Sequence, residues 1–251
     1  MLSDQGSGSW SWSYYALDWM AQSQERPAVA SMSLGGRGTQ QAMKEAVDVA
    51  VNQGVVVVVA GGNSNSDACG FSPAFVPSAI TVGSTTSRDA RSSFSNYGAC
   101  TNIWAPGSDV VSASHTSDTG SKSLSGTSMA CPHVSGAAAL VFEADNTKKP
   151  SAVLQELLDT AFLNLLTDLK TGDTNALLCV AEGGAPPTPT PVPTPAPPPG
   201  TWVVTGNGCT IDGDCIQSNN HPQDYENRAQ CSIQLYGNIQ VSVDAVNTES
   251  R

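Results

Sequence analysis

The sequence has few charged residues, and basic ones are the scarcer kind. Lysine and arginine number 11 against 22 aspartate and glutamate residues, and charged residues make up 13% of the 251-residue chain. The net charge of −11 argues against nucleic acid as a partner, because phosphate groups would be repelled. The chain also lacks an apolar run of the ~18–20 residues needed to cross a bilayer. Runs such as 55–60 are far too short.

Several familiar sequence signals are absent as well. Residues 1–12 have neither the basic region nor the apolar core of a signal peptide, so we expect that Met1 is an internal start or that part of the gene lies upstream. No Gly-x-Ser-x-Gly elbow is present, which argues against a general α/β hydrolase. No His/Cys cluster has the spacing of a zinc site. The seven cysteines favour an oxidising compartment, and their odd number leaves at least one without a partner in this chain.

Strand-like and helix-like patterns alternate along the first part of the chain. Val55 to Ala60 is a continuous β-branched run, as expected of a parallel strand that is covered on both faces. The alternation predicts the α/β class, with a parallel sheet between helices on both faces in three layers. The predicted helices are 14–24, 39–53, 127–143 and 150–162; the predicted strands are 28–34, 55–60, 79–83, 102–105 and 110–113; and 63–78 is a predicted loop.

Composition divides the chain into three parts. Residues 183–200 are rich in proline and threonine, which cannot form a core and favour an extended linker. They follow a domain at 1–182 and precede a short β-type, cysteine-bearing tail at 201–251. Within the tail, 215–235 resembles the first part of a CUB domain, a β-sandwich interaction module, so we expect a partial CUB-like module with a protein or glycan ligand. The sequence leaves open whether Cys209 or Cys215 pairs with Cys231.

The segment from Ser125 to Gly136 leads from a small, flexible entry into an apolar, alanine-rich helix. A hydroxyl in the first turn of a helix lies among N–H groups without intrahelical partners, where the helix dipole favours negative charge. Such a position suits a nucleophile whose attack creates an oxyanion. From the spacing alone, the favoured interpretation is that Thr127 or Ser128 merely caps a core helix.

Five stretches that occur in order resemble the subtilisin-like serine proteases, in their proteinase K and aqualysin-like branch. They are 31–36, 55–74, 82–98, 104–107 and 126–136, and the resemblance extends over roughly 1–180. It implies a subtilisin-like fold that is incomplete at its amino end. It also implies a secreted serine endopeptidase that cleaves polypeptides through an acyl-enzyme on Ser128, and no cofactor.

The resemblance also assigns roles to individual residues. Ser128 would be the nucleophile, and Asn63 would donate its side-chain amide to the oxyanion together with the backbone N–H of Ser128. Ser33, Leu34 and Gly35 would pair with an extended peptide as an added strand. Ala60, Gly61 and Gly62 would line the pocket for the side chain before the scissile bond.

The base and the carboxylate that serine hydrolysis requires have no match in this chain. In the family both lie upstream of the SLGG motif, and nothing before residue 31 matches either. Asp118 begins an Asp-Thr-Gly but belongs to a predicted surface turn, and His133 lies on the nucleophile's own helix with its side chain directed away. His115 and His221 have no partner in the sequence. We therefore expect this chain alone to be inactive.

The remaining implications concern cysteines and calcium. Cys69 and Cys100 fall where aqualysin-like relatives carry a disulfide, and Cys131 is expected to be a buried free thiol. Asn102 occupies the position of a calcium-binding carboxylate in the proteinase K branch, so the charge that favours Ca²⁺ is lost. The alternative to an enzyme is a secreted, non-catalytic binding protein that uses the protease-like domain and the CUB-like tail.

Overall fold

The computed structural model describes residues 3, 7–23 and 25–180 and the backbone of four short strands between 202 and 235. The chain divides into two compact units, Met1–Thr188 and Pro189–Arg251. The predicted linker at 183–200 lies outside the described residues. None of the helices in the described ranges is long and apolar enough to cross a bilayer.

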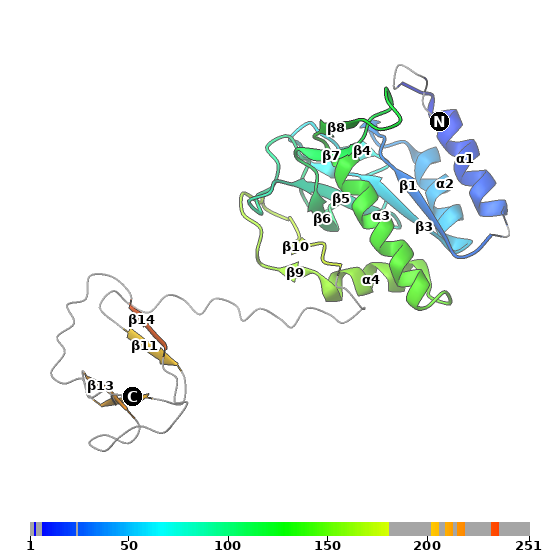
Figure 1. Cartoon of the computed structure of the whole chain (residues 1–251). Coiled ribbons are helices and arrows are strands. Elements are labelled where there is room, and N and C mark those ends of the chain that lie inside the picture. The colour runs from blue at the N-terminus through cyan, green and yellow to red at the C-terminus, as the bar shows by residue number, and fades with distance from the viewer. Residues whose placement is uncertain are drawn as a thin grey trace. The chain divides into compact units, whose positions relative to one another are not determined.

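The first unit is built on one six-stranded sheet with the order β1-β3-β5-β6-β10-β9 (Figure 1). The strands are β1 (Ala28–Met32), β3 (Val55–Ala60), β5 (Ile80–Thr85), β6 (Ile103–Pro106), β9 (Phe162–Leu163) and β10 (Ala176–Leu177). The pairs from β1 to β10 are parallel, and only β9 adds to β10 in the antiparallel direction. The predicted α/β fold with a parallel sheet is therefore confirmed, and the two-residue strands β9 and β10 extend it.

Helices cover both faces of this sheet, as predicted. The helices are α1 (Trp10–Gln22), α2 (Gln41–Asn52), α3 (Thr127–Ala144) and α4 (Pro150–Thr160). Strand β3 is buried throughout, and its valines alternate between two cores. Val55, Val57 and Val59 pack with α1 and α2, whereas Val56 and Val58 pack with α3 and α4. This alternation explains why the strand is apolar at every position.

Three smaller features lie outside the main sheet. They are the antiparallel pairs β2 (Gly36–Arg37) with β4 (Phe71–Ser72) and β7 (Val110–Ala113) with β8 (Ser121–Leu124), and the 3₁₀ turn η1 (Ala68–Gly70). The predicted strand 110–113 is thus present, but it forms a hairpin rather than part of the main sheet. Likewise, the predicted loop 63–78 contains η1 and β4.

The disulfide of the first unit and its buried thiol follow the prediction. Cys69 and Cys100 form a disulfide with a Cα–Cα distance of 5.3 Å. This bond closes a loop that begins shortly after β3 and ends just before β6. Among the described residues, Cys131 is a buried thiol without a disulfide partner, and Cys179 is a second such thiol that is partly exposed.

The second unit contains two antiparallel strand pairs. They are β11 (Trp202–Thr205) with β14 (Ser232–Leu235), and β12 (Cys209–Asp212) with β13 (Cys215–Ser218). Strands are consistent with the predicted β-type tail. The side chains, among them those of the tail cysteines and His221, lie outside the described part, so the CUB-like interpretation remains a prediction.

Candidate active site

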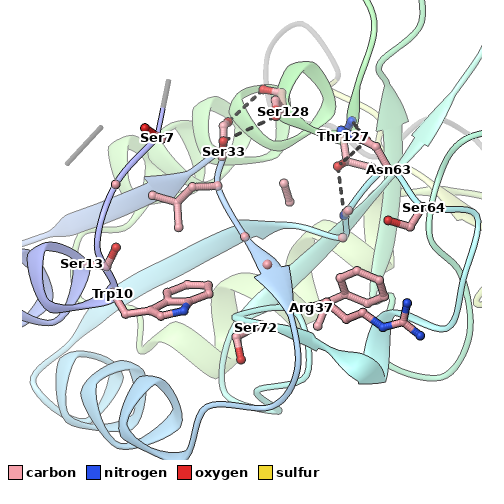
Figure 2. A pocket seen from close by; sticks show the side chains of 18 of the residues that line it. Ser7, Trp10, Ser13, Ser33, Arg37, Asn63, Ser64, Ser72, Thr127 and Ser128 are labelled. Atoms are coloured by element: carbon pink, nitrogen blue, oxygen red, sulfur yellow. Dashed lines mark hydrogen bonds between the residues drawn. The ribbon is translucent and has the colours of Figure 1, made fainter. Parts of the chain in front are cut away.

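Ser128 lies in the first turn of α3, at the carboxyl edge of the parallel sheet (Figure 2). Its Oγ donates a hydrogen bond to the carbonyl oxygen of Ser33, which follows β1, at 3.4 Å. In return, Ser33 Oγ donates to the Ser128 carbonyl oxygen at 2.8 Å. The backbone N–H of Ser128 has no hydrogen-bond partner among the described residues. It therefore remains available, with the positive end of the helix dipole, to a negatively charged atom beside Ser128.

Asn63 approaches the same helix start from the end of β3. Its Oδ1 accepts hydrogen bonds from the backbone N–H of Thr127 at 2.8 Å and from Thr127 Oγ1 at 2.9 Å. Because both bonds end on the oxygen, the amide nitrogen Nδ2 takes no part in them, and it has no partner in the described ranges. A Cβ placed on Gly126 would lie 3.4 Å from that nitrogen, so Nδ2 faces the entry to α3.

Thr127 holds the two sides of this junction together. The residue is fully buried, and its Oγ1 also accepts a hydrogen bond from the backbone N–H of Gly62 at 3.0 Å. One hydroxyl thus joins the end of β3 to the first turn of α3 across 65 positions. From the sequence we expected no more of Thr127 than a helix cap. Its place in the motif, next to Ser128, was the available signal.

Asn96 is a second residue that the sequence did not single out. It is fully buried, and its Nδ2 donates to the Gly61 carbonyl oxygen at 2.8 Å. Its Oδ1 accepts from the backbone N–H groups of Ser64 and Ser66. Gly62 has φ +104°, and a Cβ there would collide with Asn96. This position therefore needs glycine, and Asn96 fixes the loop that carries Asn63.

A cleft with a volume of about 540 Å³ runs past Ser128. One wall contains Ser33, Leu34 and Gly35, and the other contains Ala60, Gly61 and Gly62. The backbone N–H groups of Leu34 and Gly35 have no partner among the described residues, so this wall can pair with an added strand. The other described lining residues are Ser7, Gly8, Ser9, Trp10, Ser13, Gly36, Arg37, Asn63, Ser64, Phe71, Ser72, Thr127 and Ser128, of which only Arg37 is charged.

No described side chain is positioned to take a proton from Ser128 Oγ. His133 lies on the next turn of α3, where its Nδ1 is 2.8 Å from the Met129 carbonyl oxygen. His115 and Asp118 are exposed in the connection between β7 and β8, and His221 lies outside the described residues. Neither histidine of the described part is hydrogen-bonded to a carboxylate, which a base in a triad requires.

Cys131 lies one turn along α3 on the Ser33 side of the site. Burial raises the pKa of its thiol above the usual value, although hydrogen bonds, among them one from Ser31, act in the opposite direction. The sulfur lies 3.8 Å from Ser31 Oγ and 3.5 Å from the Val58 carbonyl oxygen. A protonated, buried thiol is a poor nucleophile and a poor base at neutral pH.

Asn102, at the position of the family's calcium ligand, makes a structural hydrogen bond. Its Oδ1 accepts from the backbone N–H of Thr81 at 2.7 Å. Within the described residues, no group of three or more His, Cys, Asp or Glu side chains could hold a metal ion. The residues present at this position therefore do not fit calcium.

Comparisons with known proteins agree with the geometry. The "Extracellular serine proteinase" of Thermus sp. (strain Rt41A) is 51% identical over 178 residues, which cover 71% of this chain and 43% of that protein. The "Cuticle-degrading protease" of Metarhizium anisopliae is 43% identical over 182 residues, covering 70% of this chain and 46% of that protein. The chain therefore spans less than half the length of these curated relatives.

A solved structure and a family model give the same assignment. The crystal structure of a cold adapted subtilisin-like serine proteinase is similar with a TM-score of 0.68 and 48% sequence identity, and the match covers 72% of this chain and 65% of that one. A model of the subtilase family, Peptidase S8, matches residues 1–194. The chain belongs to the subtilase family.

Proposed function

We propose that this chain supplies the nucleophile, the oxyanion site and one substrate wall of a serine endopeptidase. The observation that carries the proposal is the fixed orientation of Asn63, whose Oδ1 is taken up by Thr127 so that Nδ2 faces the start of α3. A neutral donor held in this way stabilises charge that develops beside it without having to reorient during the reaction.

The chemistry follows from these positions. Ser128 Oγ attacks the carbonyl carbon of the scissile peptide bond and gives up its proton to a base. The carbonyl oxygen becomes an oxyanion that accepts hydrogen bonds from Asn63 Nδ2 and from the backbone N–H of Ser128. When the tetrahedral intermediate collapses, the C–N bond breaks, the base protonates the leaving amine, and an acyl group remains on Ser128. Water then attacks the ester in the same way, which releases the acid and frees the hydroxyl.

The substrate is a polypeptide bound in extended form. The free N–H groups of Leu34 and Gly35 suit an added strand, and Ala60, Gly61 and Gly62 leave room for the side chain that precedes the scissile bond. The main-chain bonds would give affinity for many sequences, and the glycine-lined wall would set few limits on side-chain size.

The described residues place no base beside Ser128 Oγ. We therefore propose that the base comes from a further segment and that residues 1–251 alone are inactive. Strand β1 lies at the edge of the sheet, with β3 as its only neighbour in the described part of the chain. The carboxyl end of a further strand added parallel to β1 would lie beside Ser33 and Ser128. Helix α3 is apolar on nearly every side, yet four of its apolar or small residues are exposed, namely Pro132, Gly136, Ala139 and Leu140. A strand and helix docked there would cover both features and approach Ser128 Oγ.

The finer assignments rest on the resemblance. We place the chain in the proteinase K and aqualysin-like branch and infer that it is secreted, because the relatives include proteins named "Extracellular serine proteinase" and "Cuticle-degrading protease". Calcium is not part of the proposal, since Asn102 lacks the charge and its Oδ1 is already bonded to Thr81.

Turnover of a chromogenic peptide by two proteins tests the proposal. One is residues 1–251, and the other carries in addition an upstream segment with the Asp-Thr-Gly and His-Gly-Thr motifs. We expect no detectable hydrolysis by the first and clear hydrolysis by the second, lost on Ser128→Ala. Robust cleavage by the short chain, lost on Ser128→Ala, would show that it contains a base, with His115 the first residue to replace. An inactive long chain that folds and still binds peptides would instead favour a non-catalytic binding protein with a CUB-like tail.

A further inference from the structure

Helix α1 presents a row of aromatic side chains to solvent. Trp12, Tyr15 and Trp19 have exposed fractions of 48%, 74% and 71%. The buried side of the same helix is formed by Ser13, Leu17 and Ala21. Isolated apolar residues at a surface need no explanation, but three large aromatic rings in succession on one helix indicate a binding surface.

The three aromatic residues share one face of the helix. With 3.6 residues per turn, they fall within an arc of roughly 60°, and Trp12 and Trp19 are separated by about 10.5 Å along the helix axis. Tyr15 lies between them. The face is therefore a narrow ladder of rings rather than a pocket, and it would suit a long, flat ligand that runs along the helix.

A row of polar side chains runs beside the aromatic ladder. Ser11, Asp18 and Gln22 are exposed and fall within roughly 40° of one another, directly next to the aromatic arc. Gln22 Nε2 donates to Asp18 Oδ2 at 2.7 Å, which holds both side chains on this side of the helix. The surface thus carries exposed aromatic rings and hydrogen-bonding groups along two neighbouring lines.

We propose that this face of α1 binds the surface of a β-1,4-linked polysaccharide of the chitin or cellulose type. The sugar rings of such a polymer carry C–H groups on their flat faces, which stack on aromatic rings, and hydroxyl groups at their edges, which suit the polar row. Alternate rings along the extended chain present the same face, at a repeat close to the separation of Trp12 and Trp19. The bound polymer would hold the protein at an insoluble matrix, whatever the activity at Ser128.

Charge and area argue against other occupants. Asp18 is the only charged residue of α1, and the chain carries a net charge of −11, so the helix lacks the basic residues that meet an anionic membrane. Fully buried aromatic side chains cover 150–250 Å² each, so the exposed parts of these three amount to roughly 400 Å². A second copy docked here would bury about half of the ~800 Å² per partner that a stable interface needs.

Sedimentation with insoluble polymers tests the proposal. The protein is residues 1–251 with Ser128→Ala, so that binding is measured independently of the proposed activity, and the probes are microcrystalline cellulose and chitin. We expect binding to at least one polymer. Each of Trp12→Ala and Trp19→Ala should lower the partition constant about tenfold, as for the loss of one aromatic stacking contact. Leu140→Ala, which removes an equally exposed apolar side chain from α3, should leave it unchanged.

Each outcome decides between occupants. Circular dichroism and the melting temperature verify that the variants are folded, which their exposure leads us to expect. No binding to either polymer would overturn the proposal, and so would equal binding by the Trp12→Ala/Trp19→Ala double variant. Binding to anionic vesicles, or self-association that the double variant loses, would assign the face to a membrane or to a second copy instead.

Discussion

The two sides of Ser128 differ in how completely they are built. On the Asn63 side, three short hydrogen bonds through Thr127 fix a donor that faces the start of α3. On the Ser33 side, the Ser128 hydroxyl has a single carbonyl acceptor at 3.4 Å, and the thiol of Cys131, one turn along α3, is buried. Groups that stabilise the transition state can thus be preorganised by one part of a chain, while the proton acceptor depends on another.

Replacing Asn63 removes the oxyanion donor and has the largest expected effect on activity. In the longer protein that carries the upstream motifs, Asn63→Ala should lower kcat by about 10²–10³-fold, as the loss of one oxyanion donor does elsewhere. KM should change little, because the donor acts mainly on the transition state. Steady-state kinetics on a chromogenic peptide measures both. A loss confined to KM would mean that Asn63 binds substrate and does not stabilise the oxyanion.

The disulfide supports the same side through the loop that follows Asn63. Cys69 and Cys100 enclose a sequence separation of 31 residues. Replacing both with serine should lower the free energy of unfolding by ~3–4 kcal/mol in the chain-entropy model. Urea unfolding of the two proteins measures the difference, and reduction of the unaltered protein should reproduce it. An unchanged midpoint would show that the loop is held by its hydrogen bonds alone.

The resemblance identified the residues that would take part in the chemistry better than the residues that hold them in place. Val55 to Ala60 was predicted to the residue, because a β-branched run between a glycine and a turn leaves little choice of boundary. The two-residue strands β9 and β10 have no periodicity and could not be predicted. Asn63 and Ser128 were named from motifs, whereas the contacts of Thr127 and Asn96 join positions 64 and 35 residues apart. Such contacts exist only once the fold brings these positions together.

Thr127 tests whether the orientation of Asn63 matters as much as its presence. Thr127→Val removes the hydroxyl that bonds to Asn63 Oδ1 and to the Gly62 N–H but keeps the shape and the backbone bond. We expect kcat to fall about tenfold, which corresponds to one hydrogen bond of ~1.4 kcal/mol. Thr127→Ser should restore most of the activity, since it restores the hydroxyl. Equal losses in both variants would indicate a packing role only.

Cys131 lies on the Ser33 side of the site, and altering it has the smallest expected effect on activity. Burial raises the pKa of the thiol, so the thiolate is scarce in the folded protein at neutral pH. The thiol is an acid whose pKa is higher in the folded protein than in the unfolded one. Its contribution to the stability of the folded protein is therefore present below the unfolded-state pKa and is lost as the pH rises through the folded-state pKa. Iodoacetamide at pH 7 should therefore modify the partly exposed Cys179 and leave Cys131 unmodified until the protein unfolds. Peptide mapping after timed labelling in the presence and absence of denaturant distinguishes the two thiols. Rapid modification of Cys131 in the folded protein would reveal a reactive group next to Ser128, and the incomplete side of the site would then have a proton acceptor of its own.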